Sequence, residues 1–327
     1  MHILIASNAT IPVYAYGGTE RVLWDLACAL IKLGHRVTLM AKRGSSCPFA
    51  PVIEIDPDQD LRQQIPADVD IVHFHLRPDF DMEDTGRPYV FTQHGNEIST
   101  VPMPHNSIFV SRNHAQRFGS DQFVHNGLNW DAYGTVDFER ARTHYHFLGN
   151  AAWRVKNVRG AIDLALHAGE TLAVLGGSRF NFKRGLRFTW SRRIAFHGMV
   201  GGAKKLALLN QSRGLIFPVR WPEPFGLAII ESLYFGCPVF ATPYGSLPEL
   251  VGPECGVLSD SLAVLSEAIR HHQFDHLACH HYAATQFSAD LMAHAYLKKY
   301  TQVIDGQALA TQRPHKRDDA TIFRWDT

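Results

Sequence analysis

The sequence predicts an α/β protein made of two domains, each with a mostly parallel sheet and helices on both of its faces. Three observations support this prediction. The chain has 327 residues, which suits two domains of about 150 residues each. Short apolar strands alternate with amphipathic helices along the chain. This alternation weakens from about residue 130 to residue 144 and then begins again.

The N-terminal half opens with a strand, a helix and a second strand. The apolar segment HILIAS (2–7) is followed by a glycine pair, and residues 19–33 then carry apolar side chains at helical spacing. Gly34 occupies the position of a helix C-cap, and RVTLMA (36–41) is the next strand. A strand–helix–strand unit of about 40 residues predicts parallel pairing of its two strands.

Further strands and helices are expected in both halves. In the first half, strands are expected at DIVHFH (70–75), YVFTQ (89–93) and SIFVS (107–111), with a strand end and an Asn-Gly turn at VHNGLN (124–129). In the second half, strands are expected at HFLGN (146–150), TLAVLGG (171–177), IAFHG (194–198), GLIFPV (214–219) and PVFAT (238–242). Helices are expected over residues 157–168, 201–211, 225–236, 260–271 and 288–304.

These elements predict the domain organisation. We expect an N-terminal domain over residues 1–143 and a C-terminal domain over residues 144–288. Residues 289–305 form a last helix that packs back toward the N-terminal domain, and the tail over residues 306–327 is an appendage because it shows no sustained period. Ligands of open parallel sheets bind outside the carboxyl ends of the strands, so two such domains in tandem predict a small-molecule site in a cleft between them.

Composition excludes several classes of function. The chain has 32 Lys and Arg against 31 Asp and Glu, and a net charge of +1 gives no electrostatic reason to expect a nucleic-acid partner. No apolar run approaches the roughly 20 residues of a spanning helix, and the N-terminus lacks the basic start of a signal peptide. The five cysteines are scattered, which indicates reduced thiols and a cytoplasmic protein.

The strongest chemical signal is the segment WPEPFGLAIIESLYFGCPVFATPYGSLPELV (221–251). A turn at Pro224 leads into a helix start that contains Gly226, and the free backbone N–H groups of such a helix start suit a phosphate. Glu223 and Glu231 flank this position, where carboxylates can accept hydrogen bonds from the hydroxyls of a ribose and a sugar. The alternative is that Glu223 favours the helix dipole and Glu231 lies on a solvated face.

The segment EPFGLAIIE resembles the paired-glutamate motif of retaining glycosyltransferases with the GT-B fold, in particular glycosyltransferase family 4. Other segments match that family in the same order, namely YGGTERVLWDLACALIKLGHRVTLMA, DIVHFH, TQHGNE, VHNGLN, FHGMV and FSADLMAHAYLKKYTQVI. The resemblance covers about residues 1–305. It implies two Rossmann-like, doubly wound parallel-sheet domains that face each other across a cleft.

The resemblance also implies roles for residues of the second half. Glu231 would bind the ribose hydroxyls of the donor, and Glu223 would contact the donor sugar as a catalytic residue. The backbone amides of Phe225, Gly226 and Leu227 would hold the diphosphate and the sugar.

Further roles follow in the same way for other matched segments. Gly17 and Gly18 would let the backbone approach the donor closely, where a side chain would block it. Gly198 and Met199 would contact the base. His94 would lie beside the transferred sugar as a second catalytic residue, with packing in the TQHGN turn as the alternative.

The basic residues depart from the family pattern. Asn150 stands where the family commonly has an arginine, and Lys156 is the candidate for the lysine that follows. Arg154 is the candidate replacement for the missing arginine. Positive charge is needed here because the departing nucleoside diphosphate gains negative charge in the transition state.

The resemblance implies a cytoplasmic, retaining hexosyltransferase. Its donor would be a nucleoside-diphosphate sugar, with UDP favoured over GDP, and its acceptor a glycan or lipid-linked hydroxyl in glycan or glycolipid biosynthesis. No cofactor and no metal are expected. Two alternatives are a non-hydrolysing sugar-nucleotide epimerase and a non-catalytic nucleotide-sugar-binding protein.

Other candidate signals have more ordinary interpretations. Asp68 and Asp70 form a DxD string, but they precede an apolar strand and more simply bound a loop. His73 and His75 share one face of that strand, which suits core or cleft-edge histidines better than catalytic ones.

Two features near the C-terminus are also weighed. His276 and His280, with Cys279 nearby, have a spacing that could hold zinc, but we favour a surface helix because no second ligand cluster is evident. Trp325 and the basic RPHKR segment (313–317) could contact a membrane surface peripherally.

Overall fold

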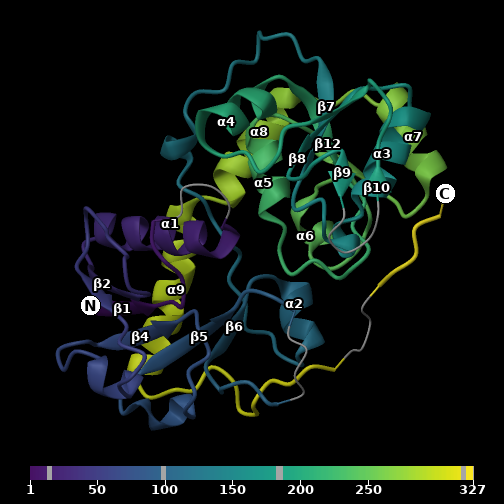
Figure 1. Cartoon of the computed structure of the whole chain (residues 1–327). Helices are drawn as coiled ribbons and strands as arrows, with labels where there is room; N and C mark the ends of the chain where they lie inside the picture. Colours follow the sequence, from purple (N-terminus) through teal and green to yellow (C-terminus); the bar gives the residue numbers. More distant parts are fainter. Residues whose placement is uncertain (13–16, 97–100, 182–186, 318–321, 327) are drawn as a thin grey trace. The chain divides into compact units, whose positions relative to one another are not determined.

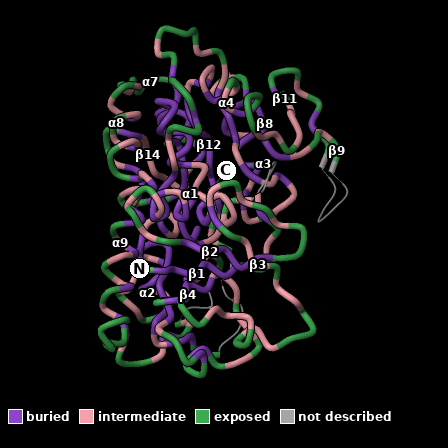
Figure 2. The backbone as a smooth tube through the Cα atoms, turned by 90° about the vertical axis from the view of Figure 1, so that its left-hand side faces the viewer, coloured by how far each residue is buried: buried purple, intermediate pink, exposed green. Residues whose placement is uncertain are grey.

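The computed structural model describes residues 1–12, 17–96, 101–181, 187–317 and 322–326. These residues form two compact units. The first contains the described residues of 1–12, 17–130 and 287–317, and the second contains those of 131–286 and 322–326. Figure 2 shows that buried residues follow the strands of both units, while exposed residues concentrate in the connections.

The first unit is built on a parallel sheet with the strand order β3-β2-β1-β4-β5-β6 (Figure 1). Its strands are β1 (His2–Ala6), β2 (Arg36–Ala41), β3 (Val52–Glu54), β4 (Ile71–Phe74), β5 (Tyr89–Gln93) and β6 (Ser107–Phe109). Strands β1, β4 and β6 are buried along their whole length. Parallel sheets that are covered on both faces need such continuous apolar strands.

Two long helices cover this sheet. Helix α1 (Gly18–Lys32) follows β1 and packs on α9 (Ala289–Ile304), which also contacts β5. After α1, Gly34 has a φ of +85°, a left-handed conformation that favours glycine at the end of a helix. The shorter helices are η1 (Leu61–Gln64), η2 (Met82–Thr85) and α2 (Arg112–Arg117).

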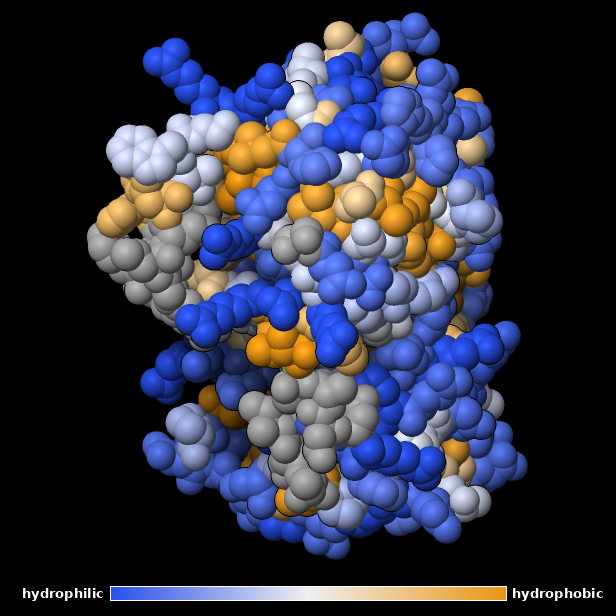
Figure 3. Space-filling view, turned by 90° about the vertical axis from the view of Figure 1, so that its right-hand side faces the viewer, coloured by the Kyte–Doolittle hydropathy of each residue, from blue (hydrophilic) through white to orange (hydrophobic). Residues whose placement is uncertain are grey.

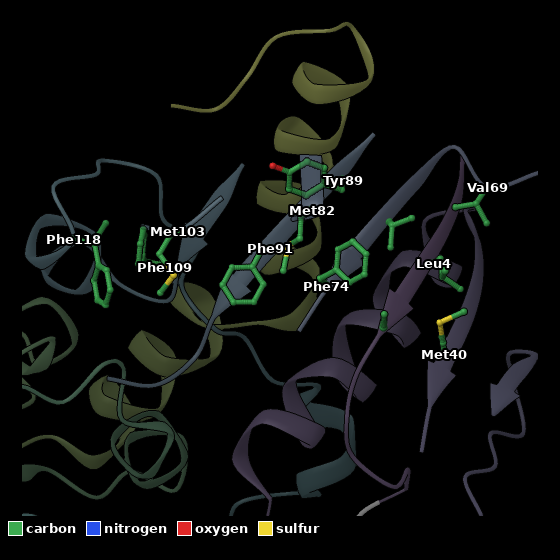
Figure 4. Packing of buried hydrophobic residues seen from close by; sticks show 13 residues of the cluster. Leu4, Met40, Val69, Phe74, Met82, Tyr89, Phe91, Met103, Phe109 and Phe118 are labelled. Atoms are coloured by element: carbon green, nitrogen blue, oxygen red, sulfur yellow. The ribbon is translucent and has the colours of Figure 1, made fainter. Parts of the chain in front are cut away.

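The faces of the first sheet differ in character. Phe74, Phe91 and Phe109 belong to one buried apolar cluster, shown in Figure 4. His73 precedes Phe74 and therefore points to the opposite face. There it meets Tyr296 and Tyr300, so α9 covers the face opposite the apolar cluster.

The second unit repeats this plan with the strand order β11-β8-β7-β12-β13-β14, again all parallel. Its strands are β7 (His144–Leu148), β8 (Leu172–Leu175), β11 (Ile194–Phe196), β12 (Ser212–Phe217), β13 (Val239–Ala241) and β14 (Gly256–Leu258). A separate antiparallel hairpin consists of β9 (Phe180–Asn181) and β10 (Arg187–Phe188). The predicted fold class of two α/β units with parallel sheets is confirmed.

The helices of the second unit follow its strands. They are η3 (Trp130–Tyr133), at which the division between the units falls, η4 (Arg154–Lys156), α3 (Val158–His167), α4 (Gly202–Asn210), α5 (Leu227–Tyr234), α6 (Leu247–Leu250), α7 (Leu262–His271) and α8 (His276–Gln286). Helix α5 packs on α8 and on strands β12 and β13. Within the described ranges, no helix has both the length and the apolar character needed to cross a membrane.

Both sheets reverse their direction of winding at the same place. Counted within each unit, both have the strand order 3-2-1-4-5-6, which reverses between β1 and β4 and between β7 and β12. Ligands of doubly wound sheets bind beyond the carboxyl ends of the strands at such reversal points. His94 follows β5, Lys156 follows β7 and Glu223 follows β12, so each unit presents predicted site residues at this edge.

The expected domain boundary at residues 143/144 lies later in the chain than the division in the structure, which falls after Trp130. Residues 131–143 belong to the second unit because their side chains are bound there. Arg142 donates from Nη1 to Ser212 O (2.6 Å) and from Nη2 to Phe235 O (2.8 Å). Because these contacts are polar, the apolar pattern of the segment does not indicate that it belongs to the second unit.

The tail, expected as an appendage, pairs through its backbone with residues of both units. Met103 N donates to Pro314 O (2.7 Å) in the first unit, and Phe323 N donates to Arg220 O (2.7 Å) in the second. Residues 318–321 and 327 lie outside the described residues. An extended segment can pair through its backbone alone. Such pairing requires no periodic pattern of side chains, so the sequence of the tail did not indicate it.

Buried neutral histidines predict a loss of stability in acid. His146 on β7 bonds through Nδ1 to Ser212 Oγ (2.6 Å) and through Nε2 to Ser232 Oγ (2.8 Å), and burial lowers its pKa to about 3. The unfolded chain takes up this proton below about pH 6.5, whereas the folded chain does not. The stabilisation is therefore present above that pH and is lost as the pH falls.

We expect this histidine to account for about 2 kcal/mol of the free energy of unfolding lost between pH 7 and pH 5. The loss, measured by urea denaturation at both pH values, should be smaller by about that amount in His146→Gln. The matched control is His271→Gln, since the side chain of His271 is 70% exposed. An equal loss in His146→Gln and the parent protein would contradict the expectation.

Candidate functional site

The loop between β12 and α5 carries the first glutamate of the predicted motif. Gly226, at the N-cap of α5, has a φ of +98°, which favours glycine. Gly245 (φ +67°) packs against the same loop, and a Cβ there would lie 2.2 Å from Glu223 N. Ser246 N donates to Glu223 O (2.9 Å). The backbone of Glu223 is thus held by the segment that follows β13.

The side chain of Glu223 forms a buried ion pair with Lys156. Lys156 Nζ lies 2.6 Å from Glu223 Oε2, and the two side chains are only 11% and 8% exposed. Trp221 Nε1 donates to the same oxygen (2.6 Å), and the ammonium lies 5.0 Å from the centroid of the Trp221 ring. A buried carboxylate needs such compensation because it has lost its hydration.

The second glutamate of the motif has a matching arrangement. Glu231 Oε1 accepts hydrogen bonds from Lys205 Nζ and from Tyr133 OH, both at 2.6 Å. The side chains of Lys205 and Glu231 are 7% and 8% exposed. The alternative of a solvated face for Glu231 is therefore wrong. Each carboxylate of the motif is buried, is paired with one lysine and accepts a hydrogen bond from one aromatic side chain.

Lys205 and Tyr133 are site residues that the sequence analysis missed. Lys205 lies on α4 one turn before Leu209, and both residues are buried. Because residues four apart share a helix face, a lysine on the apolar face of helix 201–211 could have indicated a buried charge. Tyr133 lies in the segment with the weakest apolar pattern, which gave no signal.

Helix α5 is bound at its C-terminus by the histidine-rich helix α8. His276 Nδ1 lies 2.6 Å from Gly236 O, and His280 Nδ1 bonds to Tyr234 O. A carbonyl oxygen only accepts, so His280 donates from Nδ1 to the last residue of α5, and His276 donates from Nδ1 to Gly236, two residues beyond it. These histidines therefore act as helix caps. In the described part of the chain, no group of three His, Cys, Asp or Glu residues could hold a metal.

The remaining predicted residues of the second unit are more scattered. Arg154 is exposed at the start of η4, two residues before Lys156, which is buried at its end. Gly198 and Met199 follow β11, an edge strand that β8 and β7 separate from β12. Phe225, Gly226 and Leu227 form the start of α5. The structure thus brings Lys156 and Glu223 together, and places the residues predicted to contact the base on another part of the sheet.

Gly17, Gly18 and His94 lie in the first unit. Gly17 is extended (φ −178°), so its backbone conformation alone does not require glycine, and α1 begins at Gly18. His94 Nε2 lies 2.7 Å from His75 Nδ1, and burial lowers the pKa of His94 to about 4. His94 is therefore neutral at physiological pH. Tyr16 and Glu97, at the ends of two matched segments, lie outside the described residues.

The neighbouring polar residues of the first unit have structural partners. His73 bonds to Tyr300 OH and Thr92 Oγ1, both at 2.7 Å, and its ring centroid lies 3.9 Å from that of His75. The prediction that His73 and His75 share a sheet face is confirmed. Asp70 accepts from His2 N (2.6 Å) and Asp68 pairs with Arg36, so both fix the starts of strands.

Part of the chain matches a known family in its sequence. Residues 143–272 match the family model described as "Glycosyl transferases group 1". An uncharacterized 41.2 kDa protein in the cps region of Klebsiella pneumoniae is 29% identical over 115 residues, which cover 33% of this chain and 32% of that protein. The matched part thus spans about a third of the length of that curated relative.

Several solved structures have the same fold. AviGT4, a glycosyltransferase involved in avilamycin A biosynthesis, gives a TM-score of 0.74 at 19% identity, over 93% of this chain and 98% of that one. A glycosyltransferase from Rickettsia africae gives 0.70 at 18% identity, over 94% and 99%. HepE of Anabaena, solved with UDP-glucose, gives 0.62 at 17% identity, over 92% and 100%. The predicted GT-B fold and the resemblance to glycosyltransferases are confirmed.

The pairing of Lys205 with Glu231 can be tested by a double-mutant cycle. Lys205→Met leaves a buried carboxylate without its counter-charge, and such losses cost about 3–5 kcal/mol of the free energy of unfolding. Glu231→Gln in the same chain removes the charge and should restore most of that stability. Urea denaturation of the parent, both single variants and the double variant gives the coupling free energy. Additive effects would mean that the two side chains are not paired.

Proposed function

We propose that this protein is a retaining glycosyltransferase that transfers a hexose from a nucleoside-diphosphate sugar to an acceptor hydroxyl. The observation that carries the proposal is the pair of buried carboxylates, Glu223 before the N-terminus of α5 and Glu231 within the helix. Each of them forms an ion pair with a lysine. The family match over residues 143–272 supports it, because that range contains both glutamates and both lysines.

The start of α5 is suited to the diphosphate of the donor. Backbone amides at a helix N-terminus point toward an anion, and the helix dipole favours negative charge there. Gly226 bears no side chain that would keep a phosphate away from this turn. Lys156 and the exposed Arg154 lie on η4, beyond the carboxyl end of the neighbouring strand β7, and supply the positive charge. Glu231 then binds the ribose and Glu223 binds the hexose.

The chemistry that this arrangement supports is charge stabilisation. As the bond between the hexose and the diphosphate breaks, the sugar ring gains positive charge and the leaving group gains negative charge. Glu223 stabilises the first, while Lys156 and the α5 amides stabilise the second. The acceptor attacks the face from which the diphosphate leaves, and a donor phosphate oxygen takes the acceptor proton. Neither a protein nucleophile nor a metal has a role in this proposal.

The donor and acceptor classes are also part of the proposal. HepE, with the same fold, was solved with UDP-glucose, and this supports UDP as the nucleotide, with GDP as the alternative. The curated relative comes from a cps region, and WaaG, another protein of this fold, is involved in lipopolysaccharide biosynthesis. We therefore propose a glycan or a lipid-linked glycan as the acceptor, and a cytoplasmic location.

The direct test starts with the donor. A thermal-shift screen of UDP, GDP, ADP and dTDP identifies the base, since a ligand at 100 times its Kd adds about 2.7 kcal/mol of stability. With the matching nucleotide sugar and an acceptor, proton NMR of the first glycoside should show the anomeric configuration of the donor. The reaction should persist in EDTA. An inverted product would refute the retaining assignment, and turnover without an acceptor would favour an epimerase.

The two glutamates should differ in their kinetic effects. Glu231 meets a ribose that is unchanged in the transition state, so Glu231→Ala should lose about 10- to 150-fold, mainly through a higher donor KM. Glu223 meets a ring that gains charge, so Glu223→Gln should lower kcat with little change in donor binding. Thermal melting first shows that each variant is folded. Steady-state kinetics then measures kcat and the donor KM of both variants. A folded Glu223→Gln enzyme with the parent kcat would show that Glu223 is not catalytic.

A further inference from the structure

The C-terminal segment over residues 322–326 belongs to the second unit and pairs with the loop that carries Glu223. Phe323 N donates to Arg220 O (2.7 Å), and Arg220 Nε donates to Phe323 O (2.9 Å). Arg220 directly precedes Trp221, which bonds to the Glu223 carboxylate. The two hydrogen bonds thus attach the segment to the start of the loop on which the site depends.

Arg220 also connects this pairing to η4. Arg220 N donates to Val155 O (2.7 Å), and Val155 is the residue directly before Lys156. Arg220 is therefore bonded both to η4 and to the C-terminal segment. Lys156 on η4 and Glu223 on the loop form the buried ion pair of the site, so the two parts of the chain that supply this pair meet at Arg220.

A second contact of the segment reaches Glu223 through the residues that follow β13. The rings of Phe323 and Tyr244 pack with their centroids 4.5 Å apart, and Tyr244 OH donates to Arg324 O (2.9 Å). Tyr244 directly precedes the Gly245–Ser246 segment that holds the backbone of Glu223. The C-terminal segment thus contacts two separate supports of this glutamate.

The side chains of the segment alternate between two sides, as in any extended chain. Its exposed residues are Ile322, Arg324 and Asp326, and its partly buried residues are Phe323 and Trp325. The segment runs along the right-hand side of Figure 1, and Figure 3 shows that side face-on, with mainly hydrophilic side chains at its surface. Its end is fixed at the start of α7, where Leu262 N donates to Asp326 O and Asp326 N donates to Asp260 O, both at 3.0 Å.

We propose that residues 322–326 position the Glu223 loop for catalysis, with Phe323 as the positioning residue that acts through Arg220 and Tyr244. This inference rests on the proposed function, because transfer of the hexose is the reaction for which the loop is positioned. Groups that are held in place before the reaction need no reorganisation in the transition state, and a displacement of about 1 Å can lower the rate about 100-fold. A loop that carries a catalytic carboxylate therefore benefits from support on both sides.

The sheet of the second unit is complete without this segment. Within the described part of the chain, β12 pairs with β7 and β13, and β13 pairs with β12 and β14, so each of these two strands has a neighbour on both sides. The contacts of the segment fall instead on the loops beyond β12 and β13 and before α7. A weaker contact at Phe323 should therefore loosen the Glu223 loop and leave the fold intact.

The first measurement is amide hydrogen exchange of the full chain, which needs no substrate. In Phe323→Ala, the amides of Arg220 and Ser246 should exchange at least about fivefold faster than in the parent protein, because both donate hydrogen bonds within the supported loop. Exchange in β7 and β8 should be unchanged. The matched control is Ile322→Ala, which changes a neighbouring residue that is 59% exposed and should leave every exchange rate as in the parent.

The second measurement is the steady-state kinetics of hexose transfer by the same variants. Phe323→Ala should lower kcat about tenfold and change the donor KM by less than about threefold, because Glu223 acts mainly in the transition state. Phe323→Tyr keeps the ring and should keep the parent kcat, as should Ile322→Ala. A merely structural role of Phe323 would lower the melting temperature and leave the kcat of the folded protein unchanged.

A milder variant keeps the test valid if Phe323→Ala does not fold. Tyr244→Phe keeps the ring and removes the hydroxyl that bonds to Arg324 O, so it should raise exchange at Ser246 and lower kcat, each by about threefold. The proposal is overturned if the folded variants exchange at the parent rates, or if faster exchange leaves kcat unchanged. A parent protein that transfers no hexose from any nucleoside-diphosphate sugar would refute the proposed function, whereas parent-like exchange in Phe323→Ala would refute this inference separately.

Discussion

A carboxylate that is buried away from water must be compensated by charge or hydrogen bonds, and the second unit meets this requirement twice around one helix. Lys156 and Trp221 bind Glu223, and Lys205 and Tyr133 bind Glu231. The compensating groups come from η3, η4, α4 and the loop before α5. Because neither glutamate can be buried unless these segments are in place, the two ion pairs tie the local structure of the site to the folding of the whole unit.

Helix α5 is held along its length by partners from elsewhere in the unit. The Gly245–Ser246 segment binds the loop before its N-terminus, and His276 and His280 of α8 bind the carbonyls at its C-terminus. In its middle, the Ser232 hydroxyl donates to Ala228 O (2.6 Å), so its oxygen accepts from His146 Nε2 on β7. A helix fixed in this way keeps its first amides in one position, and preorganised donors are the condition for charge stabilisation in catalysis.

The two sheets share one topology but place different chemistry at their reversal points. In the first unit, neutral histidines follow β4 and β5, and His75 bonds to His94 at 2.7 Å. In the second unit, Lys156 follows β7 and Glu223 follows β12, and the two form an ion pair. The same strand order thus carries neutral residues at one edge and charged residues at the other. Topology fixes where the loops lie, and the sequence of each loop fixes which side chains are found there.

Elements with a local signal could be predicted from the order of amino acids alone. Apolar alternation and helical spacing predicted β2, β5, α1 and α9 nearly to the residue, because strands and helices that face a core repeat their apolar side chains at fixed periods. The motif from Glu223 to Glu231 indicated the candidate site and, through its resemblance to glycosyltransferases, the fold. The short strands β3 and β14 and the hairpin β9–β10 were not predicted, since a few residues are too short to show a period.

The partners of the motif residues become evident only when the chain is folded. Lys205 and Tyr133 lie 26 and 98 positions from Glu231 along the chain, and His280 lies 46 positions from the carbonyl that it caps. These partners come from elements that are distant in sequence and meet only in the folded unit. No local sequence pattern therefore predicts them. The tail shows the same limit, because its backbone pairing with each unit depends on the edges that those units present, not on its own side chains.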